Sequence, residues 1–293
     1  MKRQSGFTLV ELMIASIIGL VLMASLMNLF ITTNRSVALS DGLAQNQETG
    51  RFAMDFITKY ARLAGYTTDF TEYTPPLIMK TDQADCDADP DLPACTSAVS
   101  TVITCFTSPE KDACSANNPA GIFGDRIAFP YVANEEVRSC TGSLIPEGTR
   151  LANVFWVSSD TATSNELRCR TYDYANKVWL DEAISIVNNI DSLEFQVGIA
   201  DEEADRNASR YVNLTTIEDN LDITLNRVRS FRVALLTSSM DELDNNKVRT
   251  NIQSRKYTLL DGPTITTSDG NLRYIFTNTI ELPNLIEGSV FYN

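Results

Sequence analysis

Hydrophobic and polar positions divide the first part of the chain into two helical segments with different surroundings. From Leu12 to Ile31 there is no charged residue, and a helix of about 20 apolar residues is long enough to cross a bilayer. From Thr32 to Gly65 apolar residues recur at helical spacing, which predicts one apolar face; its aromatic members are Phe52, Phe56 and Tyr60. We therefore expect one long helix, apolar on every side over residues 7–31 and packed against a folded domain over residues 32–65.

Residues 66–293 show the patterns of β-strands. Short runs of alternating or β-branched apolar residues are separated by turn clusters such as Asp261–Gly270. The predicted strands are Thr101–Phe106, Arg126–Val132, Asn153–Val157, Glu166–Tyr172, Ala183–Val187, Ser192–Ile199, Val228–Thr237 and Leu272–Leu282. The segment Ile217–Leu225 is expected to form a short helix or an irregular lead into the next strand. A long helix packed on an antiparallel β-sheet is an α+β architecture, and we expect that class here.

The start of the chain combines a basic leader, a glycine and a single carboxylate inside an apolar segment. Lys2 and Arg3 open a leader that ends in Gly6, Phe7 begins the apolar segment, and Glu11 lies within it. A charge inside a membrane helix costs about 2.5–3.5 kcal/mol on insertion scales, so Glu11 is expected to have a partner and a functional role. The combination resembles the prepilin signature of type IV pilins and type II secretion pseudopilins.

This resemblance implies a processing site and an assembly residue. In prepilins a membrane peptidase cuts after the glycine on the cytoplasmic side, and the new first residue is methylated. Residues 1–6 are then the leader peptide, and the cut falls between Gly6 and Phe7. The cationic amine freed at Phe7 is expected to pair with Glu11 of a neighbouring subunit, which relieves both charges in apolar surroundings. In the simpler interpretation Glu11 only reaches to the membrane surface.

A secretory signal peptide and a plain membrane anchor are two further interpretations of the N-terminus. A signal peptide has a shorter apolar region that ends in small residues, whereas this apolar segment is longer and no Ala-x-Ala pattern closes it. A plain anchor explains the apolar segment but leaves the joint occurrence of Gly6, Phe7 and Glu11 without a reason. The prepilin interpretation accounts for all of these features.

Composition and charge limit the chemistry of the folded domain. The chain has 24 basic and 38 acidic residues and a net charge of −14, which argues against direct nucleic-acid binding through a basic groove. Histidine is absent, so Ser-His-Asp and Cys-His nucleophile systems are excluded, and no glycine-rich phosphate loop occurs. We expect a structural protein without a cofactor; a membrane-anchored enzyme is the least favoured alternative.

The six cysteines all follow the apolar segment, and an even number of cysteines in an exported domain implies disulfides. Spacing suggests Cys86–Cys95 and Cys105–Cys114 as two short loop closures, and Cys140–Cys169 as a link between two predicted strand regions. Six thiols allow about fifteen complete pairings, so spacing alone leaves the choice open. A zinc site is disfavoured because histidine and Cys-x-x-Cys pairs are both absent.

Alternating aspartates occupy the segment that a Cys86–Cys95 disulfide would close. They are Asp85, Asp87, Asp89 and Asp91. Carboxylate oxygens at alternate positions can wrap Ca²⁺, although the glycine and the terminal glutamate of an EF-hand loop are missing. A solvated acidic loop is therefore the favoured interpretation, and a calcium site is the alternative.

Several blocks beyond the N-terminus resemble the PilW family of minor pilins. They are Gly50–Met54, Arg62–Tyr66, Cys140–Gly142, Asn153–Val157, Glu166–Cys169, Val228–Leu236 and Arg273–Leu282. The chain departs from the family at Pro283, where arginine is expected before Asn284. The segment 69–120 holds four of the six cysteines, matches no family pattern and distinguishes this chain.

The resemblance implies a minor pilin that waits in the bacterial inner membrane as a single-pass protein with its head in the periplasm. Its expected partners are prepilin peptidase, the inner-membrane assembly machinery, other minor pilins and the major pilin. It would prime pilus assembly and enter the pilus near the tip, at the cell surface, so that motility, adhesion or DNA uptake depends on the fibre. A type II secretion pseudopilin and a tip adhesin that binds through residues 69–120 are the alternatives.

Overall fold

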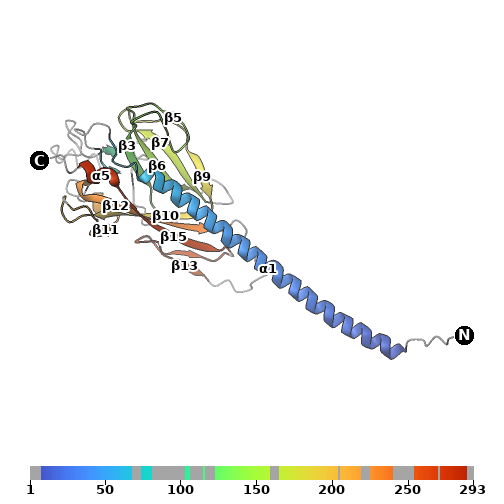
Figure 1. Cartoon of the computed structure of the whole chain (residues 1–293). Coiled ribbons are helices and arrows are strands. Elements are labelled where there is room, and N and C mark those ends of the chain that lie inside the picture. The colour runs from blue at the N-terminus through green and yellow to red at the C-terminus, as the bar shows by residue number, and fades with distance from the viewer. Residues whose placement is uncertain are drawn as a thin grey trace.

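The computed structural model describes residues 8–67, 74–80, 103–105, 115, 123–158, 165–203, 205–218, 225–239, 254–269 and 271–288. The protein consists of one long helix, α1 (Leu9–Ala61), and a head built from antiparallel β-sheets (Figure 1). The C-terminal part of α1 packs into the head, and its N-terminal part extends away from it (Figure 1). The predicted α+β class, with a long helix packed on antiparallel sheet, is confirmed.

The helix ends at Ala61, and the residues predicted to complete it form a turn. Arg62 closes the helix, and Gly65 has a φ of 76°, a left-handed conformation that glycine adopts without steric cost. The N–H of Gly65 donates to the carbonyl of Pro130 at 2.9 Å. The chain therefore leaves the helix before Gly65 because this glycine turns the backbone toward strand β3 (Ile127–Val132).

The C-terminal sheet has four antiparallel strands in the order β11-β10-β12-β15. Their bounds are Arg210–Val212 for β11, Ile190–Ile199 for β10, Val228–Ser238 for β12 and Arg273–Glu281 for β15. The β12–β15 pairing is continuous in register, whereas the β10–β12 pairing is interrupted by register shifts near both ends of β10. Strand β15 lies at one edge of this sheet.

The N-terminal sheet contains β3 followed by β6 (Arg150–Ser158), β7 (Glu166–Asp173) and β8 (Val178–Trp179), with β9 (Ile184–Asn188) also paired to β7. Three small pairs lie outside both sheets. They are β1 (Ile78–Lys80) with β2 (Ile103–Cys105), β4 (Val137–Arg138) with β5 (Leu144–Ile145), and β13 (Arg255–Tyr257) with β14 (Ile265–Thr267). The short helices are α3 (Leu214–Glu218), the 3-10 turn η2 (Leu225–Arg227) and α5 (Pro283–Gly288).

The strands predicted from alternation are all present, with small shifts at their ends. The segment Asp261–Gly270 differs from its prediction as a turn because it contains β14, which pairs with β13. The segment Ile217–Leu225 lies between α3 and η2, and only its two ends fall within the described residues.

Aromatic rings from both sheets form the centre of the core. Phe129 of β3, Phe155 of β6, Phe195 of β10 and Phe231 of β12 are fully buried. The ring centroids of Phe129 and Phe231 are 5.5 Å apart, and those of Phe195 and Phe231 are 4.9 Å apart. Each buried ring contributes roughly 1.5–3 kcal/mol. The two sheets are therefore held face to face by aromatic packing, and one face of α1 completes the same core.

Candidate functional site: the N-terminal helix and its seat in the head

Glu11 closes a capping box at the start of α1. The Thr8 hydroxyl accepts the Glu11 N–H at 3.3 Å, and Glu11 Oε2 accepts the Thr8 N–H at 2.9 Å and the Thr8 hydroxyl at 3.0 Å. Thr-x-x-Glu is the sequence signature of this cap, so the pattern was readable in the sequence. Gly6 and Phe7 lie outside the described residues, and the pairing of Glu11 with the Phe7 amine stays a prediction.

The first half of α1 exposes an apolar surface on every side. Within the described part of the chain, α1 is the one helix long and apolar enough to cross a membrane, and none of that span is buried in the protein. Leucine, isoleucine, valine and methionine side chains from Leu9 to Ile31 are all largely exposed. An apolar surface of this size marks a membrane or protein contact. Lipid or other chains must therefore cover it.

The second half of α1 packs into the head through one face, and we call it the seated half. Its buried positions are Asn46, Gly50, Ala53, Met54, Ile57, Tyr60 and Ala61. The ring of Phe56 packs edge-on against Phe155, with centroids 6.1 Å apart, and the Tyr60 hydroxyl donates to the carbonyl of Ser139 at 3.1 Å. Phe52 contacts Phe56 but remains about half exposed, at the border of the face that packs against the head.

Gly50 allows β15 to approach the helix closely. A Cβ at this position would overlap the ring of Phe276, which lies directly against the helix backbone. About two helical turns further along α1, the Asn278 amide donates to the Thr58 hydroxyl at 3.3 Å. The helix is continuous through Gly50, so this glycine serves close packing against β15.

The C-terminal end of α1 is capped by a residue from the other end of the chain. The Asn284 amide of α5 donates to the carbonyls of Arg62 at 2.8 Å and Ala64 at 3.3 Å. Arg62 is the C-cap residue of α1 and Ala64 lies in the turn that follows, so this side-chain donor supplies partners for carbonyls that the helix itself cannot satisfy. The Pro283-Asn284 pair, where the sequence departs from its family pattern, thus begins α5 and places this cap.

Replacing Asn284 is expected to loosen this helix end. Asn284→Ala removes both hydrogen bonds and should lower the free energy of unfolding by about 1 kcal/mol, measured by denaturant titration. Asn284→Asp should lower it at least as much, because a carboxylate cannot donate to carbonyls. Thr279→Ala, at an exposed position, is the control and should change little. Unchanged stability in both Asn284 variants would contradict the capping role.

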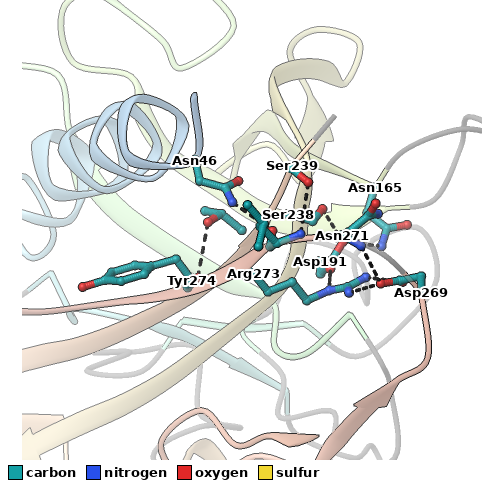
Figure 2. Close-up of polar contacts among 11 residues, drawn as sticks. Asn46, Asn165, Asp191, Ser238, Ser239, Asp269, Asn271, Arg273 and Tyr274 are labelled. Carbon is teal, nitrogen blue, oxygen red and sulfur yellow. Dashed lines mark hydrogen bonds and ion pairs between the residues drawn. The ribbon is translucent and has the colours of Figure 1, made fainter. Parts of the chain in front are cut away.

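A polar cluster, which we call the collar, lies beside one side of α1 where the helix leaves the head (Figure 2). We define the collar as Asn46, Asp191, Ser238, Ser239, Asp269 and Arg273. The Asn46 amide donates to the carbonyl of Leu272 at 2.8 Å, and the N–H of Leu272 donates to the Ser239 hydroxyl at 3.1 Å. The collar therefore connects the helix to the ends of β12 and β15.

Arg273 is the centre of the collar. Its side chain is 7% exposed and donates to Asp191 Oδ2 at 2.5 Å and to the two oxygens of Asp269 at 2.5 and 2.7 Å (Figure 2). Burial by itself lowers the pKa of Arg273, but the hydrogen bonds and charges of Asp269 and Asp191 raise it overall. The hydrogen bond from Arg273 in turn lowers the pKa of Asp269. Arg273 and Asp269 are thus held in their charged forms.

The disulfide Cys140–Cys169 is confirmed. The two Cα atoms are 6.2 Å apart, both cysteines are buried, and the bond joins the turn after β4 to β7. Cys86, Cys95 and Cys114 lie outside the described residues, as does the side chain of Cys105 in β2, so the two loop closures stay predictions. The aspartates 85, 87, 89 and 91 also lie outside them. Among described residues, no three or more potential ligands gather as a metal site.

Two buried carboxyls meet beside β10. Glu194 is 3% exposed and hydrogen-bonded to Asp125, which is equally buried. Asp125 Oδ2 accepts the N–H of Phe195 at 2.9 Å, and Gly262 lies so close that a Cβ there would overlap the Glu194 carboxyl. Burial first, and then the charges of Asp125 and Asp261, raise the pKa of Glu194 to about 9. Glu194 is therefore neutral at pH 7.

Comparison with known proteins places these features in a family. Residues 154–284 match the family of Type IV Pilus-assembly protein W (PilW), and residues 1–27 match the prokaryotic N-terminal methylation motif. Among solved structures the chain is similar to a type IV-like pilin from Thermus thermophilus, with 13% identity, a TM-score of 0.33, and coverage of 59% of this chain and 83% of that one. No curated protein sequence matches. By its two family matches, the chain is a PilW-type type IV pilin.

Proposed function

We propose that this chain is a minor pilin that takes part in priming type IV pilus assembly and is then incorporated near the pilus tip. The observation that carries the proposal is the division of α1 into an exposed apolar half and a half seated in the head. Lipid and the apolar helices of other subunits can cover the same exposed surface. The subunit can therefore pass from membrane to fibre with its head unchanged, and helix packing replaces lipid contacts.

The proposed location before assembly is the inner membrane, with the head in the periplasm. The basic residues Lys2 and Arg3 precede the apolar segment, and basic flanks favour the cytoplasmic side. The disulfide Cys140–Cys169 supports an oxidising compartment for the head. The partners that follow are prepilin peptidase, the inner-membrane assembly machinery, other minor pilins and the major pilin. Motility, adhesion or DNA uptake would be properties of the assembled fibre.

N-terminal mass spectrometry on the protein from sheared pili and from membranes tests this function. We expect a methylated Phe7 terminus in both fractions, with a small amount in the pili. The major pilin serves as the control for shearing, and an unrelated inner-membrane protein serves as the control for contamination. A processed Phe7 terminus found only in membranes would favour a pseudopilin-like or purely priming subunit. An uncleaved Met1 terminus would overturn the filament interpretation.

A further inference from the structure

Strand β15 presents backbone groups that no described residue uses. The Ser239 N–H donates to the Leu272 carbonyl at 2.9 Å, and the Leu282 N–H donates to the Arg229 carbonyl at 3.0 Å. Hydrogen-bonded pairs alternate along an antiparallel ladder, so the even-numbered residues of β15 bond to β12. The odd-numbered residues of β15 direct their N–H and C=O groups away from β12. Within the described residues these groups have no backbone partner. They belong to Arg273, Ile275, Thr277, Thr279 and Glu281.

The edge strand of the N-terminal sheet, β3, is closed by contrast. The Ala128 N–H donates to the Ser115 hydroxyl at 2.9 Å. Pro130 has no N–H to offer. The Val132 N–H donates to the carbonyl of Tyr66 at 2.9 Å. Each position at which β3 could accept another strand is thus occupied or blocked.

The part of β10 that extends beyond β11 is closed in the same way. The Leu193 N–H donates to the carbonyl of Phe123 at 3.2 Å, and the Phe195 N–H donates to the carboxylate of Asp125 at 2.9 Å. The segment 123–125 therefore covers this edge. The fold protects two edges with specific contacts and leaves β15, a nine-residue strand, open within the described residues.

The side chains of β15 also lack the usual protection of an edge strand. Proteins guard exposed edges with charges, prolines or bulges. The exposed residues along β15 are Tyr274, Ile275, Thr277 and Thr279, and the one exposed charge is Glu281 at the far end. Arg273 is buried in the collar, and the strand contains neither a proline nor a bulge. Such a strand is suited to pairing.

The open edge runs alongside the seated half of α1. Leu272 lies against Gly42 and Phe276 lies against Gly50, so β15 and α1 run in the same direction. When neighbouring subunits pack the exposed halves of their helices side by side, their heads come together near the part of α1 that β15 accompanies. The edge is therefore continuous with the surface through which the subunit assembles.

We propose that β15 accepts a β-strand from the head of a neighbouring pilin-type subunit that is less acidic than this chain. The inference rests on the proposed function, because helix packing in the membrane or fibre supplies the neighbour. Main-chain hydrogen bonds to the odd-numbered residues would hold the added strand. A second copy of this chain is a poor occupant, since two chains of net charge −14 repel each other.

The test combines crosslinking with removal of one outward N–H. The full-length protein, with the photoreactive residue p-benzoylphenylalanine at position 279, is expressed in piliated cells and irradiated. Thr277→Pro deletes the outward N–H at the middle of the edge and keeps every hydrogen bond to β12. Thr277→Ala keeps that N–H and is the matched control. Thr277→Lys, which places a charge on the strand without touching the backbone, is the second variant.

We expect a crosslinked species between this chain and another pilin-type subunit, mapped by mass spectrometry to a strand of that subunit. Thr277→Pro and Thr277→Lys should reduce it about tenfold, and Thr277→Ala should leave it unchanged. Equal yields in all variants, or a crosslink to a second copy, would overturn the inference. If the chain is processed and present in pili but gives no pilin crosslink at position 279, the strand pairing alone fails. If the chain is unprocessed and absent from pili, the proposed function fails and the pairing with it.

Discussion

Glu11→Gln is expected to remove this protein from sheared pili while leaving membrane insertion and cleavage after Gly6 intact. Glutamine at this position can still accept the Thr8 N–H, so the helix start is preserved. It cannot neutralise the amine of Phe7 on a neighbouring subunit. Breaking a buried ion pair costs about 3–5 kcal/mol, which corresponds to a loss of more than about a hundredfold in incorporation. Immunoblots of the pilus and membrane fractions measure how much of the protein is incorporated into pili.

Thr8→Ala is the matched variant that separates charge pairing from helix capping. It removes both capping contacts of the Thr8 hydroxyl and keeps the carboxylate of Glu11. We expect near-normal incorporation, because the loss of one exposed cap costs only about 1 kcal/mol. The opposite pattern, with Thr8→Ala excluded from pili and Glu11→Gln incorporated normally, would assign Glu11 to the cap and contradict the pairing.

Glu194→Gln is expected to raise the melting temperature near pH 8 by about 5 °C or more and to reduce its pH dependence. The pKa of Glu194 is raised from 4.5 to about 9 in the folded protein, where burial and the neighbouring Asp125 favour the neutral form. Between these two values the unfolded chain releases a proton that the folded chain retains, so the free energy of unfolding falls as pH rises. Glutamine stays neutral and can still donate to Asp125.

Thermal melts of the two proteins at several values between about pH 5 and pH 8 measure this effect. Glu147→Gln is the control, because it makes the same change of charge at an exposed turn and should leave the pH dependence as it is. Identical pH dependence in wild-type protein and Glu194→Gln would show that the Glu194 carboxyl does not hold its proton in the folded state.

The sequence predicts those parts of this fold in which the pattern is local. The long helix follows from an uncharged segment and an apolar stripe, and the strands follow from alternation, because each face of a sheet has its own surroundings. The spacing of the cysteines suggested Cys140–Cys169, but the choice among the possible pairings came from the fold. The Thr8–Glu11 capping box was equally local.

The features that depend on distant partners could not be predicted in this way. Asn46, Asp191 and Arg273 each appear ordinary in sequence, and only the fold brings them together in the collar. Gly50 suggests a weak point in a helix when it is considered alone, yet its role is set by Phe276 at the other end of the chain. The open edge of β15 is a property of what the other strands leave uncovered.

The position of the collar also determines how far a tilt of the helix in the membrane displaces the head. With Leu12–Ile31 in a bilayer, the helix between that segment and Asn46 is exposed apart from Gly42 and about 14 residues long, or about 21 Å. Asn46 and the collar stand off the lipid surface by this length, and a single helix joins them to it. A tilt of about 10° at the membrane would move the collar sideways by about 4 Å. Small rotations of the anchor are therefore converted into displacements that approach the spacing of about 4.8 Å between neighbouring strands.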